Sequence, residues 1–160
     1  MRKKAVAIAA VSLLAAAALI IALWPGGASA ARQPQTLTFT DKQVKEVDVD
    51  NGAPHFSAGD VFIDHDVLYQ GGSVAGKLGV LNTITSLDQK AHTAEAVFTA
   101  GAKIPGGTLA FSGRLQFPPH HHMFQVPIVG GTGDFQTARG YATVHNISNK
   151  VSRITIYLVP

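Results

Sequence analysis

Three aspartates and one arginine are the side chains of this sequence that best suit acid–base chemistry. Asp64 and Asp66 lie two residues apart in an alternating segment, and Asp134 and Arg139 flank the end of a glycine-rich stretch. An apolar environment disfavours the ionised form of a carboxylate, so a buried aspartate can act as a general acid near neutral pH. A neighbouring arginine can stabilise negative charge that develops on a substrate oxygen. This chemistry requires the side chains to converge in one pocket.

Two other motifs carry less support. The consecutive histidines His120–His122 point in different directions on an extended loop and lack the spaced partners of a zinc site, so we predict a solvated loop and no metal site. The segment Gly130–Gly133 lacks the lysine and the following helix of a phosphate-binding loop. A G-x-S-x-G motif is absent, which leaves a serine nucleophile without support.

The predicted strand that carries the two neighbouring aspartates has two possible orientations. Within Val61–Tyr69, the residues Phe62, Asp64, Asp66 and Leu68 share one face, and the alternate residues share the other. One orientation directs both carboxylates into the interior, and the other leaves them in water. Buried carboxylates are costly unless they are paired, so the residues alone leave both orientations open.

The first thirty residues predict export. The basic segment Arg2–Lys4 precedes an apolar stretch, Ala5–Trp24, and Ala28–Ala30 fits a signal-peptidase site. A cleaved signal peptide implies a secreted or extracytoplasmic protein. The apolar stretch is also long enough to span a bilayer, so an uncleaved membrane anchor is the alternative. We exclude residues 1–30 from the fold and predict one domain over residues 31–160.

Charge and cysteine content exclude several classes of protein. Three of the thirteen basic residues belong to the export segment, so the remaining chain has ten basic and ten acidic side chains. A domain with no net charge and no basic patch is not expected to bind nucleic acid. The chain has no cysteine. An exported fold without disulfides favours an architecture that satisfies its own strand edges, such as a closed barrel.

Alternating apolar segments predict an all-β domain. The clearest alternation, Thr108–Phe117, places Leu109 and Phe111 on one face, and no helical periodicity follows the export segment. A series of short strands that follow one another closely in the sequence is typical of a sandwich or a barrel. The predicted strands are Thr36–Thr40, Gln43–Asp50, Val61–Tyr69, Leu78–Leu87, Thr93–Ala100, Thr108–Phe117, Phe124–Val129, Tyr141–Ile147 and Arg153–Val159.

The stretch Ile128–Val144 has the features of a hairpin corner. Its glycines, within Gly130–Gly133, allow a tight turn, and alternation resumes soon afterwards. On the residues alone, the simpler interpretation of Asp134 and Arg139 is a surface salt bridge at this corner.

Three segments resemble the superfamily that contains the dirigent proteins and the allene oxide cyclases. His65–Tyr69, followed by Gly71 and Gly72, is similar to the dirigent H-D-I-L-Y segment. Leu109–Arg114 resembles the strand before the longest loop of the family. Val129–Tyr141 matches the G-G-T-G-x-F-x-x-A-R-G-Y signature of the family, and the segments follow its order and spacing.

The resemblance implies an eight-stranded antiparallel closed β-barrel with a largely apolar cavity and no cofactor. Members of the family bind a reactive hydrophobic intermediate and control its stereochemistry, often as trimers in plants. By resemblance, Asp66 takes the place of a pocket aspartate and Arg139 that of a pocket arginine, which favours the inward orientation of Asp64 and Asp66. Thr38 and Thr40 stand where allene oxide cyclases place a glutamate and an asparagine, which speaks against allene oxide as the substrate.

We therefore predict a cofactor-free cyclase or isomerase that controls the stereoselective cyclisation, including cycloaddition, of a hydrophobic polyketide- or polyene-like molecule. A homo-oligomer, either dimer or trimer, is expected from the resemblance. The alternatives are a non-catalytic carrier of a hydrophobic ligand and a structural protein with a filled barrel. The predicted catalytic residues are Asp66, Arg139 and Asp64, and the predicted substrate-binding residues are Phe62, Phe98, Phe111, Asp134 and Tyr141.

Overall fold

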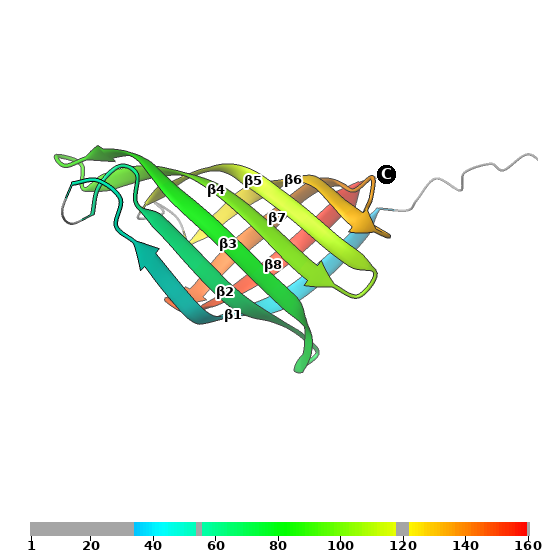
Figure 1. Ribbon diagram of the computed structural model, residues 1–160. Helices are drawn as coiled ribbons and strands as arrows, with labels where there is room; N and C mark the ends of the chain where they lie inside the picture. Colours follow the sequence, from blue (N-terminus) through cyan, green and yellow to red (C-terminus); the bar gives the residue numbers. More distant parts are fainter. Residues whose placement is uncertain (1–33, 54–55, 118–121, 160) are drawn as a thin grey trace, which may run out of the picture. The chain divides into compact units, whose positions relative to one another are not determined.

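The computed structural model describes residues 34–53, 56–117 and 122–159 (Figure 1). In this part of the chain eight strands form a closed barrel, in which each strand pairs antiparallel with its neighbours in sequence and β1 pairs with β8. This confirms the prediction of an all-β, eight-stranded antiparallel barrel. The strands are β1 (Gln35–Val49), β2 (Val61–Gln70), β3 (Ser73–Asp88), β4 (Thr93–Ile104), β5 (Gly107–Phe117), β6 (Met123–Gly133), β7 (Arg139–Ser148) and β8 (Val151–Val159).

The predicted export segment, residues 1–30, lies outside the described residues, as do His120 and His121. The described residues contain no helix that is long and apolar enough to span a membrane. The strands of the barrel extend from Gln35 to Val159.

The first two predicted strands are one strand, β1, which contains a bulge. Gln43 lies opposite Asp66 of β2 and Lys45 lies opposite His65, so Val44 is an extra residue without a partner of its own. A bulge changes the phase of the side-chain alternation without ending the strand. The predicted break after residue 40 is therefore wrong, and a single strand carries the side chains of both predicted segments.

The glycine-rich stretch belongs to a strand rather than to a turn. β6 continues to Gly133, which lies opposite Gly107 of β5. The turn follows the strand and is closed by hydrogen bonds from Phe135 N to the carbonyl of Thr132 (3.1 Å) and from Ala138 N to the carbonyl of Phe135 (2.9 Å). The hairpin corner therefore lies a few residues later than the glycines predict.

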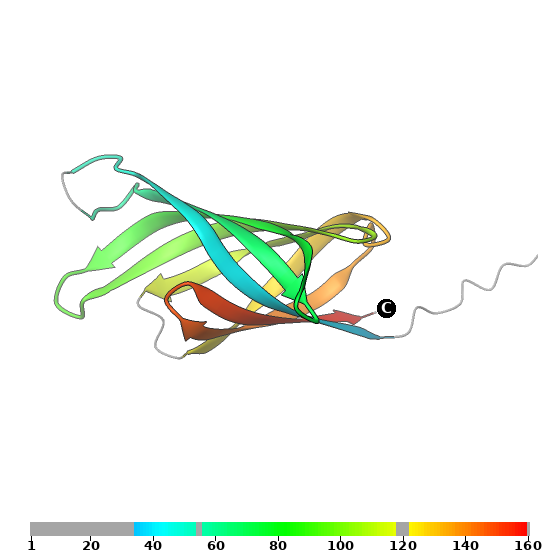
Figure 2. The ribbon, with the colours of Figure 1, turned by 90° about the horizontal axis from the view of Figure 1, so that it is seen from below.

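Two hydrophobic clusters pack the barrel. Figure 2 shows the β3–β4 and β7–β8 hairpins at one end of the barrel and the β4–β5 hairpin at the other end. The larger cluster includes Ile104, Leu109 and Phe135, which lie next to the β4–β5 and β6–β7 turns. The smaller cluster lies near the β3–β4 hairpin. It consists of Ile84, Ala94 and Ala96, with Phe62, Leu87 and Phe117 packed against them.

Candidate functional site

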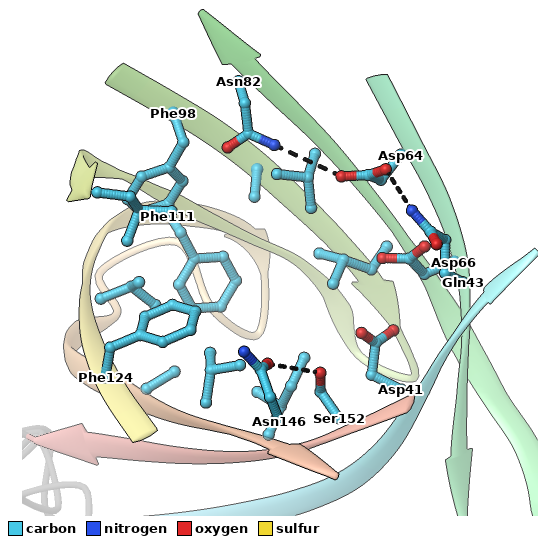
Figure 3. Close-up of a pocket in the computed structure, with 18 of the residues that line it drawn as sticks. Asp41, Gln43, Asp64, Asp66, Asn82, Phe98, Phe111, Phe124, Asn146 and Ser152 are labelled. Carbon is cyan, nitrogen blue, oxygen red and sulfur yellow. Dashed lines mark hydrogen bonds between the residues drawn. The ribbon is translucent and has the colours of Figure 1, made fainter. Parts of the chain in front are cut away.

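The barrel contains a cavity with a volume of about 540 Å³. Sites for small molecules usually have volumes of about 300 to 1,000 Å³. Residues from all eight strands line the cavity. One side is apolar, because the rings of Phe98 on β4, Phe111 on β5 and Phe124 on β6 face the interior (Figure 3).

Three carboxyl groups lie on the opposite side of the cavity. Figure 3 shows Asp41 of β1 and Asp64 and Asp66 of β2 across from the phenylalanines. Asp41 shares the inward face of β1 with Phe39, and Asp66 shares the inward face of β2 with Leu68. Only 9 % of Asp41 and 7 % of Asp66 are exposed. The alternation of both strands thus directs acids into an interior that is otherwise apolar.

Amide side chains hold Asp64. Gln43 Nε2 donates a hydrogen bond to Asp64 Oδ1 over 2.6 Å, and Asn82 Nδ2 donates to Asp64 Oδ2 over 3.4 Å. Gln43 Nε2 also donates to Glu46 Oε2 over 2.7 Å. These bonds connect β1, β2 and β3 across the acidic side of the cavity and fix the orientation of Asp64.

Other polar atoms in this region have no partner. Among the described residues, the buried oxygens Asp41 Oδ1, Asp66 Oδ1 and Asn82 Oδ1 make no hydrogen bond. A buried polar atom without a partner costs about 1 to 3 kcal/mol. A ligand that offers hydrogen-bonding groups at this position would offset that cost.

Burial raises the pKa of all three aspartates. Desolvation, followed by the negative charges of Asp66 and Asp64, raises the pKa of Asp41 from 3.8 to about 7. Desolvation and the charge of Asp64 raise the pKa of Asp66 to about 6. Desolvation also raises the pKa of Asp64, although the hydrogen bond from Gln43 opposes this shift. The cavity therefore combines two acids, Asp41 and Asp66, that titrate near neutral pH with a carboxyl group, Asp64, that accepts hydrogen bonds from amides.

The structure brings together some of the residues predicted from the sequence. Asp64, Asp66, Phe98 and Phe111 all line the cavity. Phe62 lines a smaller neighbouring pocket, which also contacts Asp64. The inward orientation of β2 is therefore the one that the structure adopts.

Three other predicted residues do not line the cavity, and the expectation that they do is corrected here. Arg139 is exposed at the start of β7, opposite Val159. Asp134 is exposed in the turn after β6. Tyr141 points outward because its neighbour Ala142 faces the interior, and its ring stacks on that of Tyr157 with 4.9 Å between the ring centroids.

A comparison with protein families decides what kind of barrel this is. The model of the family described as "Dirigent-like protein" matches residues 29–159. The chain belongs to the dirigent-like protein family. A comparison with curated protein sequences finds no match.

Solved structures share the dirigent-like fold at low sequence identity. A pyocyanin demethylase is 22% identical with a TM-score of 0.67, and the match covers 78% of this chain and 100% of that one. A pterocarpan synthase dirigent protein is 24% identical with a TM-score of 0.61, covering 79% and 87%. An exo-specific intermolecular Diels–Alderase is 14% identical with a TM-score of 0.64, covering 79% and 98%. At these identities the likeness shows the fold alone.

Sequence reasoning missed Asp41, a buried residue of the dirigent-like cavity whose pKa is raised to about 7. Its signal was present, because Asp41 continues the alternation of Leu37 and Phe39. Thr38 of the same strand is exposed, whereas Asp41 lines the cavity. Other cavity residues that sequence reasoning missed include Gln43, Asn82, Arg114 and Phe124.

The described residues contain no group of three or more His, Cys, Asp or Glu side chains that could hold a metal ion. The cavity offers a ligand carboxyl and amide groups on one side, aromatic rings on the other, and the cationic side chains of Arg114 and Lys150.

Proposed function

We propose that this dirigent-like barrel binds a hydrophobic small molecule in its cavity and catalyses the cyclisation or isomerisation of that molecule without a cofactor. One observation carries the proposal: buried aspartates with raised pKa values face an aromatic wall across a cavity of about 540 Å³. An apolar interior that only stabilised the fold would not need carboxyl groups, because burying them is costly.

The cavity would contribute to the reaction in two ways. Its apolar wall, including Phe98 and Phe111, would hold a flexible molecule in a reactive conformation, which removes much of the entropic part of the barrier. Asp66 and Asp41, in their neutral forms, would donate a hydrogen bond or a proton to a carbonyl oxygen of the substrate. Arg139 lies outside the cavity, so it cannot polarise a substrate carbonyl there. We assign that role to Asp66 and Asp41 instead.

Proteins of the same fold support this reaction class. The structural relatives include a pterocarpan synthase dirigent protein and a Diels–Alderase, and both names describe the formation of cyclic products. A polyketide- or polyene-like substrate fits the mixture of aromatic and acidic cavity residues. The basic and apolar leader, residues 1–30, supports a location outside the cytoplasm, either secreted or anchored at the membrane.

The Asp66→Asn variant is expected to lose turnover by about 100- to 10,000-fold while it still binds the substrate, because an amide cannot donate the proton of the acid. The test is mass spectrometry of small molecules that co-purify with each protein from its native host. The wild-type protein should carry the cyclised product, and the Asp66→Asn variant should carry the uncyclised precursor.

The control is Asp50→Asn, which removes a carboxylate from the exposed surface outside the cavity. This variant should carry the same product as the wild-type protein. The same unchanged ligand in wild type and Asp66→Asn would contradict the catalytic role and identify a carrier. A wild-type protein that carries no ligand and excludes apolar dyes would contradict binding altogether.

A further inference from the structure

The cavity breaks the alternation rule at one place in the barrel wall. In a paired strand only every second side chain faces the interior. β3 follows this rule, since Leu78, Val80 and Asn82 line the cavity and the residues between them do not. β5 and β6 do not follow it: four consecutive residues of each, Arg114–Phe117 and Met123–Val126, line the cavity.

The cause is an unpaired section of the wall. The ladder between β5 and β6 joins Gly107–Phe111 to Ile128–Gly133, and in the described residues it goes no further. Beyond this point outward-facing side chains of both strands reach the cavity because no backbone hydrogen bonds close the wall between them. We call the opening between Arg114–Phe117 and Met123–Val126 the slot.

Charge distinguishes the slot from the rest of the cavity. The carboxyl groups that line the cavity come from β1 and β2. Two cationic side chains, Lys150 and Arg114, also line the cavity. Lys150 lies beside β1, because its carbonyl accepts a hydrogen bond from Gln43 N (3.0 Å). Arg114 is the cation of the slot, accompanied by the amides of Gln116 and Gln125. An anionic group would be attracted to the guanidinium of Arg114 in the slot.

We propose that the substrate is an elongated amphipathic molecule whose anionic end, a carboxylate or an acidic enolate, lies in the slot against Arg114. This inference rests on the proposed function, because it assigns a substrate class to the same cavity. The apolar body lies against the phenylalanines, and the planar guanidinium binds the anionic end with paired hydrogen bonds. Arg114 is then a residue that determines substrate specificity and orients the molecule towards the aspartates.

Two fluorescent probes test the assignment: cis-parinaric acid, a conjugated polyene with a carboxylate, and its uncharged methyl ester. Wild-type protein should bind the acid more tightly than the ester. Arg114→Gln should weaken binding of the acid by about three- to tenfold, as loss of one charge-assisted contact implies. The same variant should change the affinity for the ester by less than about twofold. Arg114→Lys should restore part of the affinity for the acid, since it restores the charge without the planar fork.

The matched control is Arg153→Gln, which removes the same charge from the exposed surface of β8, outside the cavity lining. It should leave binding of both probes unchanged. Equal losses for acid and ester in Arg114→Gln, or equal losses of acid binding in Arg114→Gln and Arg153→Gln, would overturn the slot assignment and leave the proposed function intact. If neither probe binds wild-type protein, the amphipathic substrate class and the hydrophobic cavity function are both rejected.

Discussion

At pH 8 the Asp41→Asn variant is expected to be more stable than the wild-type protein, by about 1 to 3 kcal/mol in the free energy of unfolding. At pH 4.5 the two proteins should differ little. The reason is the pKa of Asp41, which burial and the neighbouring aspartates raise from 3.8 to about 7. At pH 8 the folded wild-type protein must keep an ionised carboxylate in its interior, and the variant does not.

The sign of the effect follows from proton linkage. The folded state holds the proton of Asp41 more tightly than the unfolded state, so between about pH 4 and pH 7 the folded state binds more protons and stability falls as the pH rises. If the whole difference in pKa appeared as stability, it would amount to about 4 kcal/mol. Solvent that enters the cavity would screen part of the charge, which reduces the expected effect. Asp66, whose pKa is raised to about 6, adds to the same trend.

Urea unfolding of both proteins at several pH values between 4 and 8 measures this effect. The wild-type protein should lose stability across this range, and the curve of Asp41→Asn should be flatter. Asp50→Asn removes an exposed carboxylate and controls for the change in net charge. Parallel curves for Asp41→Asn and wild type would show that Asp41 is not the group responsible.

Replacing Gly140 with alanine should destabilise the barrel by about 3 kcal/mol or more. Gly140 has a φ of 131°, a conformation that residues with a side chain rarely adopt. A methyl group at this position would also overlap the backbone carbonyl oxygen of Tyr157 on the paired strand β8. Backbone atoms in a ladder cannot move away as a flexible side chain can, so β7 and β8 would have to separate.

Gly101→Ala is the matched control for this substitution. Gly101 lies on β4, and a methyl group there would meet no atom within 4 Å. This variant should be as stable as the wild-type protein or more stable by up to about 1 kcal/mol, because alanine restricts the unfolded chain more than glycine does. Both variants can be compared by urea unfolding. Equal effects of the two substitutions would contradict the backbone argument at Gly140.

The alternation of apolar residues was sufficient to predict most strands, because burial on one face leaves a period of two in the sequence. It could not predict how β1 and β6 continue. The bulge at Val44 shifts the phase of β1, so the chain looks like two short strands although its backbone is continuous. The glycines of β6 resemble a turn, but Gly133 lies in a ladder, opposite Gly107.

The residues of the candidate site were likewise predicted only in part. Asp66 was predicted to lie inside the barrel because a family resemblance decided between two faces that both contain apolar residues. Arg139 was predicted from the same resemblance and Tyr141 as a residue of the cavity wall, and the structure places both outside the cavity. Alternation puts Tyr141 and Ala142 on opposite faces, and only the structure shows that Ala142 is the buried one. Desolvation raises the pKa of Asp41 most, and the charges of Asp66 and Asp64 on another strand add to it; only the fold produces this burial and brings these groups near.

The barrel closes through the pairing of β1 with β8, its first and last strands. While a ribosome is making the protein, β1 therefore has no partner on one side until Val151–Val159 has been synthesised. Contacts between such distant parts of a chain slow folding. A strand with a free edge also invites pairing with other chains. The barrel therefore cannot close, and this edge of β1 remains available for pairing, until Val151–Val159 has been made.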